Sequence, residues 1–73
     1  MKYERYLDLS GDGGIIGFII LENRIFILFD NGYWYEYDDI KPGTEHIDEM
    51  KDFAITGKGL KTYINQNVRG NYM

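Results

Sequence analysis

The stretch from Arg24 to Ile40 constrains the fold more than any other part of the chain, because it predicts a β-hairpin. Apolar and aromatic runs flank Asn31-Gly32. Asn-Gly suits a two-residue type I′ turn, in which both central residues need a positive φ. With this pair as the loop, the expected cross-strand pairs are Asp30–Tyr33, Phe29–Trp34, Leu28–Tyr35, Ile27–Glu36 and Phe26–Tyr37. Aromatic and branched pairs each contribute up to about 1 kcal/mol, so turn and pairs favour the same register.

The residues before the hairpin predict further strands. Residues 15–21 (IIGFIIL) are rich in β-branched side chains, and Glu22-Asn23 forms a tight turn into a strand over residues 24–29. Gly17, inside the earlier strand, indicates a bulge or the close approach of another group. Residues 2–9 alternate loosely and predict a short, accessory edge strand.

Two short helices are expected after the last strand, residues 33–38. Lys41-Pro42-Gly43 ends the sheet, and Thr44 is the expected N-cap of a helix of about ten residues that ends at Thr56-Gly57. Apolar residues at helical spacing predict a second helix over residues 60–68. The fold class is therefore α+β: a three- or four-stranded antiparallel meander followed by two helices, in one domain over residues 1–73.

Composition and patterning together predict self-association. The chain has 73 residues and no cysteine, so aromatic packing or oligomerisation must supplement a small core. The expected register leaves both sheet faces apolar. One face carries Ile16, Phe18, Ile20, Ile25, Ile27, Phe29 and Trp34; the other carries Ile15, Gly17, Ile19, Phe26, Leu28, Tyr35 and Tyr37. Two helices cover one face, so we expect a homo-oligomer, most simply a two-fold dimer, with a ligand site at the junction near Gly17. The alternative is that residues 1–9 cover the second face.

The charge is unevenly distributed along the chain. All 12 acidic residues and five of the eight basic ones lie in residues 1–52, whereas residues 53–73 carry only Lys58, Lys61 and Arg69. The C-terminal segment is thus either an anion-facing surface or a partner for Asp38 and Asp39 within the fold. No secretory leader opens the chain, and its longest apolar run, residues 15–21, is too short to span a bilayer. We expect a soluble cytoplasmic protein without membrane contact.

Two segments resemble the KTSC domain, a small domain found at the C-terminus of some lysyl-tRNA synthetases and in free-standing bacterial and phage proteins. The first is Phe29-Asp30-Asn31-Gly32 followed by Tyr35-Glu36-Tyr37. The second is residues 63–72, with Asn65, Arg69 and Tyr72 at the family's spacing. The resemblance covers roughly residues 15–72, although the family's Ala-x-Ser-x-Gly joint is altered here to Ala54-Ile55-Thr56-Gly57-Lys58-Gly59. It implies RNA binding.

Catalysis and metal binding are not expected. The single histidine, His46, falls in the first turn of a predicted helix, and Ser10 has no neighbouring base. We therefore predict a non-enzymatic module, without cofactor, for RNA or a nucleotide-like anion; one variant is an oligomer that sequesters a small nucleotide signal. Aromatic rings would stack on bases and cations would meet phosphate. The candidate ligand-binding residues are Arg69, Lys61, Lys58, Asn65, Tyr33, Trp34 and Tyr72.

An alternative function belongs to a different class. The net charge of −4 also suits a small acidic phage-type inhibitor that acts through protein–protein contacts. Basic residues clustered beside a pocket favour the binding module, whereas a continuous acidic face without a pocket favours the inhibitor.

Overall fold

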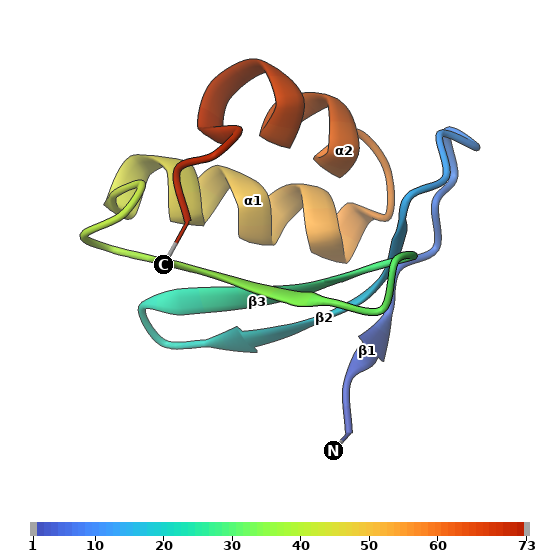
Figure 1. Cartoon of the computed structure of the whole chain (residues 1–73), viewed down its shortest axis with the longest axis horizontal. Helices are drawn as coiled ribbons and strands as arrows, with labels where there is room; N and C mark the ends of the chain where they lie inside the picture. Colours follow the sequence, from blue (N-terminus) through green and yellow to red (C-terminus); the bar gives the residue numbers. More distant parts are fainter. Residues whose placement is uncertain (1, 73) are drawn as a thin grey trace.

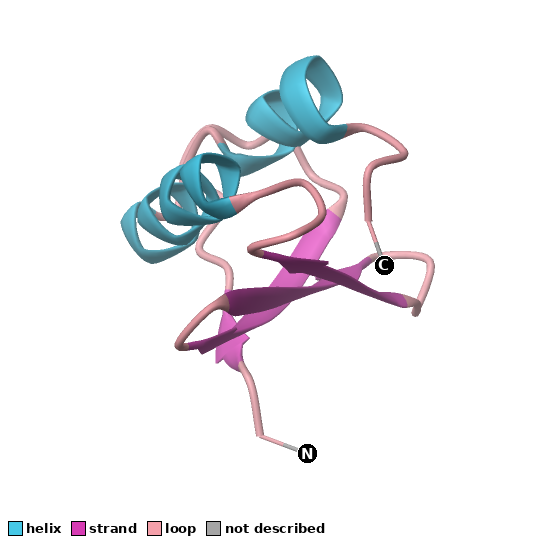
Figure 2. Cartoon of the chain, turned by 90° about the vertical axis from the view of Figure 1, so that its left-hand side faces the viewer, coloured by secondary structure: helices cyan, strands magenta, loops and turns pink. Residues whose placement is uncertain are grey.

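The computed structural model describes residues 2–72, which form a sheet layer and a helix layer (Figure 1). The antiparallel sheet has the strand order β1 (Glu4–Arg5), β2 (Ile15–Leu21), β3 (Arg24–Phe29) and β4 (Trp34–Asp38). Helix α1 (Thr44–Thr56), the short helix α2 (Leu60–Tyr63) and the π-helical turn η1 (Ile64–Val68) lie on one side of it (Figure 2). The predicted α+β meander followed by helices is confirmed.

Strands β2 and β3 have the predicted bounds and are joined by the predicted turn at residues 22–23. Ile20 pairs with Ile25 and Phe18 with Ile27, which is the register that a two-residue turn at Glu22-Asn23 requires. Further along, Ile15 rather than Ile16 pairs with Phe29, because a bulge falls between Ile15 and Gly17. The bulge expected near Gly17 is therefore confirmed, and it turns Ile15 into the core.

The predicted register of the β3–β4 hairpin is wrong by one residue. Leu28 pairs with Trp34 and Ile27 with Tyr35. The loop has three residues: the Gly32 N–H donates to the Phe29 carbonyl at 3.0 Å, and the Phe29 N–H donates to the Tyr33 carbonyl at 3.1 Å. Gly32 has φ 87° while Asn31 keeps a negative φ, as in a type I turn closed by a glycine bulge. Asn-Gly is compatible with this turn and also with a type I′ turn, but the extra loop residue shifts every cross-strand pair by one position.

The shifted register changes which side chains face the helices. Tyr35 and Tyr37 lie opposite Ile27 and Ile25, not Leu28 and Phe26, so they join the core side of the sheet. Trp34 instead points away from the helices. The core contains Tyr6, Ile15, Phe18, Ile25, Ile27, Tyr37, Ile47, Met50, Ala54, Leu60, Ile64 and Val68.

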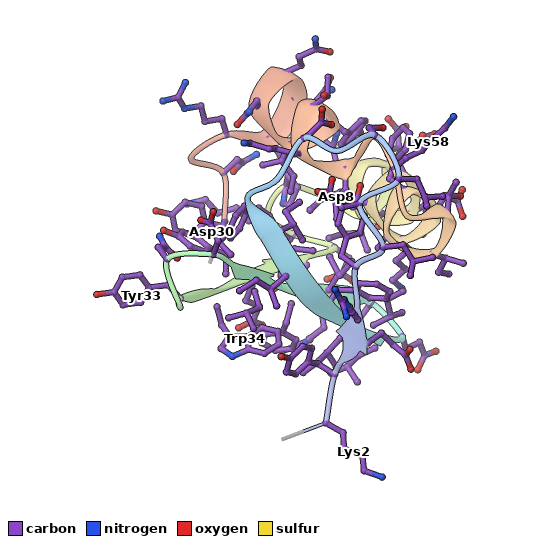
Figure 3. The ribbon with its side chains drawn as sticks, turned by 90° about the vertical axis from the view of Figure 1, so that its right-hand side faces the viewer. Lys2, Asp8, Asp30, Tyr33, Trp34 and Lys58 are labelled. Atoms are coloured by element: carbon purple, nitrogen blue, oxygen red, sulfur yellow. The ribbon has the colours of Figure 1, made fainter. Side chains whose placement is uncertain are left out.

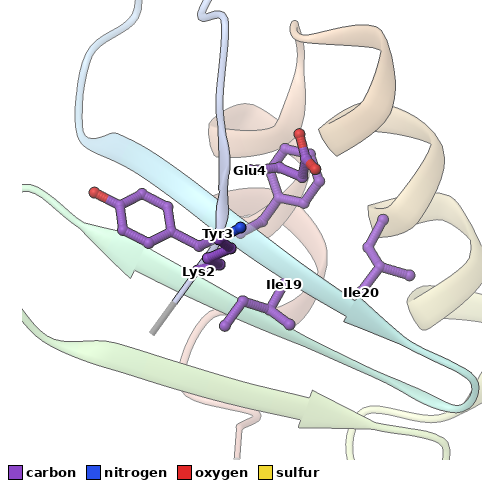
Figure 4. Close-up of a pocket in the computed structure, with 6 residues that line it drawn as sticks. Lys2, Tyr3, Glu4, Ile19 and Ile20 are labelled. Atoms are coloured by element: carbon purple, nitrogen blue, oxygen red, sulfur yellow. The ribbon is translucent and has the colours of Figure 1, made fainter.

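The sheet face away from the helices is the second apolar face that the sequence predicts, with a revised membership. We call it the open face; its apolar members are Tyr3, Ile19, Leu21, Phe26, Leu28 and Trp34. Tyr3 and Ile19 lie on this side of β2, and Ile20 lies toward the helices (Figure 4). The Tyr3 ring passes over Gly17, where any Cβ would collide with it, and meets Trp34 edge-on at 5.5 Å between ring centroids. The N-terminal segment thus covers this face only with Tyr3.

The N-terminal segment is mainly an edge element. Strand β1 has two residues, fewer than the predicted 2–9, and pairs with Phe18 and Gly17 of β2. Tyr6 then enters the core from the edge, and its hydroxyl accepts a hydrogen bond from the Leu60 N–H at 3.2 Å.

The helices follow the predicted apolar spacing with altered ends. Thr44 is the first residue of α1 rather than its N-cap; Gly43 occupies the N-cap and offers no side-chain cap. Helix α1 ends at Gly57 as predicted. The predicted second helix is α-helical only to Tyr63 and continues as η1, and its stripe Leu60, Ile64 and Val68 is buried.

Candidate functional site

A pocket of about 180 Å³ lies between the helix side of the β3–β4 hairpin and the C-terminal tail. The hairpin supplies Phe29, Asn31, Tyr35 and Tyr37. Segment η1 and the tail supply Ile64, Asn65, Arg69, Gly70 and Tyr72. The tail leaves η1 and descends toward the sheet (Figure 2), and its Gly70 and Tyr72 line the pocket.

Four aromatic rings form the apolar wall of the pocket. Tyr35 meets Phe29 at 5.0 Å and Tyr72 at 4.6 Å between ring centroids, both at 84°. Tyr72 also meets Tyr37 at 6.1 Å and 72°. These edge-to-face contacts are favourable and hold the rings in place. Tyr72 remains 38% exposed, so its ring is the accessible stacking surface at the mouth.

Tyr37 presents a polar group at the base of this wall. Its side chain is 2% exposed, and burial, with further effects from Tyr35 and Tyr72, raises the pKa of its phenol to about 12. The hydroxyl is therefore protonated at neutral pH and can donate a hydrogen bond. No hydrogen bond joins it to another of residues 2–72.

Segment η1 positions the polar side of the pocket. Buried Ile64 and Val68 hold the segment on the core, which leaves Asn65 and Arg69 exposed at the pocket. Single π-helical turns occur frequently at functional sites. The Asn71 N–H then donates to the Val68 carbonyl at 2.8 Å and turns the chain back toward the sheet. This turn brings Tyr72 against Tyr35.

Arg69 does not form an ion pair with Asp38 or Asp39, which was the alternative that the sequence left open. Among residues 2–72, the ion pair is Arg24–Glu36 at 2.8 Å, on the other side of the sheet. The Asp38 carboxylate instead accepts from the backbone N–H groups of Lys41 (2.8 Å) and Ile40 (2.9 Å), and these hydrogen bonds lower its pKa. The Arg69 guanidinium thus remains available to an anion at the pocket.

The structure brings together three of the seven predicted ligand-binding residues, Asn65, Arg69 and Tyr72. The other four lie outside this pocket, and their part in ligand binding stays a prediction. Lys61 reaches the Asp12 carbonyl at 3.4 Å, and Lys58 lies between two turn glycines (Figure 3). Tyr33 is at the hairpin tip, and Trp34 is on the open face (Figure 3).

Sequence reasoning missed the hairpin residues of the pocket. Asn31 was used only as a turn residue, and Tyr35 and Tyr37 were placed on the wrong face. The missing information was the hairpin register. The run Phe29-Asp30-Asn31-Gly32 also fits a three-residue loop with glycine in the bulge position, which places both tyrosines toward the helices.

Larger hollows flank β1 but do not form a defined site. One of about 530 Å³ is lined by Tyr3 and Ile19 from one face of β2 and by Phe18 and Ile20 from the other. Because successive strand residues point to opposite faces, this hollow lies beside the sheet edge rather than in one face.

Neither a metal-binding cluster nor a membrane-spanning helix is found among residues 2–72. No cluster of three or more His, Asp or Glu side chains is placed to bind a metal ion there. His46 Nδ1 lies 2.6 Å from the Tyr63 hydroxyl, outside the pocket. No helix in this part of the chain has the length and apolar composition needed to cross a membrane.

Comparisons of the chain with protein-family models, with curated proteins and with solved structures found no match. The KTSC resemblance therefore stays a prediction. Five of the residues on which it rests, Tyr35, Tyr37, Asn65, Arg69 and Tyr72, line the pocket.

Proposed function

We propose that this protein is a non-enzymatic cytoplasmic module that works as a homo-oligomer and binds RNA or a nucleotide-like anion in the pocket beside Arg69. A base would stack on Tyr72, and Arg69 would bind a phosphate. The amides of Asn31 and Asn65 and the Tyr37 hydroxyl would hydrogen-bond to base or sugar edges. Stacking on aromatic rings and cation–phosphate contacts are the two usual components of single-strand recognition.

The observation that carries this proposal is an Arg69 guanidinium without an acidic partner among residues 2–72, beside an exposed tyrosine ring. A structural arginine in an acidic protein would be expected to approach a carboxylate. Here the acidic residue of the neighbouring strand end, Asp38, is occupied by backbone donors. The pocket therefore combines an aromatic surface with a cation that has no acidic partner in the described part of the chain.

The size of the pocket limits the ligand. Pockets for drug-sized molecules occupy about 300–1,000 Å³, and this one is smaller, at about 180 Å³. We infer that it accepts one base or one phosphoryl group, with the rest of the ligand lying along the surface. A single-stranded RNA and a small nucleotide both satisfy this limit.

The test is an NMR titration of the ¹⁵N-labelled protein with AMP and, separately, with a short single-stranded adenine-rich RNA. We expect shifts in the side-chain amides of Asn31 and Asn65 and in the Arg69 backbone amide. Binding should weaken as salt rises, because phosphate contacts release counterions. A larger affinity for the RNA than for AMP would identify a single strand as the ligand.

The matched variants are Arg69→Glu and Lys58→Glu, which make the same change of charge. Arg69→Glu should abolish binding, whereas Lys58→Glu, outside the pocket, should leave most of it. Equal losses in the two variants would show only a general charge effect. Unchanged binding in Arg69→Glu would reject the pocket as the site.

A specific observation supports the inhibitor as a second candidate. Helix α1 exposes Glu45, Asp48, Glu49 and Asp52 on its solvent side. Such a surface can compete with nucleic acid for a basic protein. Its test is displacement of labelled duplex DNA from a basic DNA-binding protein, and the triple variant Glu45→Gln/Asp48→Asn/Glu49→Gln should lose that competition. If AMP and RNA fail to bind and competition is seen, the second function replaces the first.

A further inference from the structure

The open face is the largest feature that the proposed ligand pocket does not explain. Five of its six apolar members come from strands β2, β3 and β4, and the sixth, Tyr3, immediately precedes β1. Tyr3, Leu21 and Trp34 are 46%, 48% and 37% exposed. Leu21, Phe26, Ile19 and Trp34 surround a hollow of about 420 Å³. Trp34 and Lys2 lie on the side of the sheet remote from the helices (Figure 3).

An antiparallel sheet with one solvated face should place polar side chains on that face. Here Ile19 and Leu21 in β2, Phe26 and Leu28 in β3, and Trp34 in β4 occupy those positions. A contiguous apolar surface of this kind usually marks a protein interface. The only segment of residues 2–72 that reaches over it is the one carrying Tyr3, and the Tyr3 ring leaves Leu21 and Trp34 exposed.

We propose that the open face is the interface of a two-fold homodimer, in which the sheets of two copies pack face to face. The dimensions of the molecule are compatible with a second copy on this face. The Cα trace spans 29 Å and 21 Å in the two directions of the sheet layer (Figure 1), which bounds the face at roughly 600 Å². Two such faces bury up to roughly 1,200 Å², which reaches the lower limit for specific stable interfaces. A second copy presents an apolar face of the same extent, so each open face covers the other.

The charges on the open face are also self-complementary. Arg24 and Glu36 pair at 2.8 Å across β3 and β4, on this side of the sheet, with side chains 40% and 29% exposed. A two-fold axis brings a surface patch against itself. Because Arg24 and Glu36 carry opposite charges, each Arg24 can meet the partner's Glu36 as well as its own. A patch of a single sign would repel its own copy.

The proposed dimer places the two ligand pockets on its outer sides. The pocket near Arg69 is on the helix side of the sheet, opposite the open face. The Gly17 gap, expected from the sequence to hold ligand at the subunit junction, is filled by the Tyr3 ring. The dimer therefore stands independently of the ligand function, and the two pockets should bind without coupling.

The first measurement is sedimentation equilibrium of the full chain from micromolar to millimolar concentration. We expect the wild-type protein to reach twice the 8.6 kDa of one chain. Leu21→Glu puts a charge into the interface and should give a monomer that retains the native circular dichroism spectrum. Ile55→Glu makes a comparable change at a 67% exposed position on α1 and should leave the dimer intact.

The second measurement uses Trp34, which is the only tryptophan of the chain. Dilution of the wild-type protein should shift its fluorescence to longer wavelength and increase acrylamide quenching as the dimer dissociates. Leu21→Glu should show the dissociated spectrum at every concentration. A wild-type monomer over the whole range, with concentration-independent fluorescence, would overturn the proposal and leave the face to a different partner. A dimer that survives Leu21→Glu would place the interface elsewhere.

Discussion

At the scale of single residues, Tyr37 connects the core to the pocket. Its side chain is buried and also lines the pocket, and its hydroxyl has no hydrogen bond to another of residues 2–72. The aromatic residue that stabilises the fold is thus also one that can donate to a ligand. Tyr37 belongs to the core on the helix side of the sheet, opposite Ile25 rather than Phe26 as the predicted register has it.

Tyr37 should make the protein sensitive to alkaline pH. Its pKa is about 12 in the folded state against the ordinary tyrosine value of 10.0, so the fold favours the neutral form. Stability from this group is complete below pH 10.0 and falls as pH rises toward 12, by on the order of 2 kcal/mol. Urea unfolding of Tyr37→Phe should show a smaller loss over this range than the wild type. Parallel pH profiles for the two proteins would contradict the assignment.

Asp38 should make the stability of the protein sensitive to acidic pH. Its pKa is lowered by the hydrogen bonds from Lys41 and Ile40. Its contribution to stability is therefore present above the ordinary aspartate value of 3.8 and is lost as pH falls through the lower folded pKa. Asp38→Asn keeps an acceptor oxygen but cannot titrate. Its urea midpoint should therefore change less on acidification than that of the wild type. Asp38→Ala, which loses the acceptor, should be the less stable variant at neutral pH.

At the scale of elements, the β3–β4 hairpin decides the composition of both sheet faces. A one-residue change of register exchanges every side chain of a strand between faces. The three-residue loop sends Tyr35 and Tyr37 to the pocket and Trp34 to the open face. The proposed ligand pocket and the proposed dimer interface therefore both depend on the conformation of residues 29–33.

Gly32 should be the most sensitive position of this loop. Its φ is 87°, and a Cβ added there would meet no other atom within 4 Å. The effect of Gly32→Ala is therefore backbone strain alone, about 1–2 kcal/mol. Gly32→Asn should cost less, because asparagine tolerates the left-handed region. Urea unfolding of the two variants measures the difference, and equal stabilities would argue against the glycine bulge.

At the scale of the whole molecule, the N-terminal segment contacts the start of α2. Tyr6 lies 54 residues before Leu60, is buried, and accepts the Leu60 N–H at 3.2 Å. This contact joins the sheet edge to the second helical segment. The N-terminal segment therefore contributes to the core even though its ladder with β2 is short.

Removing the Tyr6 hydroxyl should destabilise the whole fold. Tyr6→Phe leaves a buried Leu60 N–H without its acceptor, which costs about 1–3 kcal/mol. The matched control is Tyr3→Phe, because the Tyr3 side chain is 46% exposed and its hydroxyl makes no hydrogen bond within residues 2–72. Denaturant unfolding should separate the two variants by most of that difference. If Tyr6→Phe is as stable as Tyr3→Phe, a water molecule has replaced the Tyr6 hydroxyl as the acceptor for the Leu60 N–H.

The amino-acid sequence by itself determined the local elements. The apolar runs of β2 and β3, the turn at residues 22–23, the stop at Gly57 and the buried stripe of residues 60–68 all follow from neighbours a few positions apart. Such signals depend on the strand period, on helical spacing and on turn residues, which one segment carries alone. The apolar second face of the sheet was predictable for the same reason.

Only the tertiary structure decided the hairpin register and the candidate site. Asn31-Gly32 is compatible with both loop lengths, and the choice follows from which tyrosines pack under α1 and η1. The pocket joins residues 29–37 to residues 64–72, and the Tyr6–Leu60 contact joins the N-terminal edge to α2. Lys58 and Lys61 are close to Arg69 in sequence but lie outside its pocket. Contacts between distant segments depend on how whole elements pack, and no local pattern records that packing.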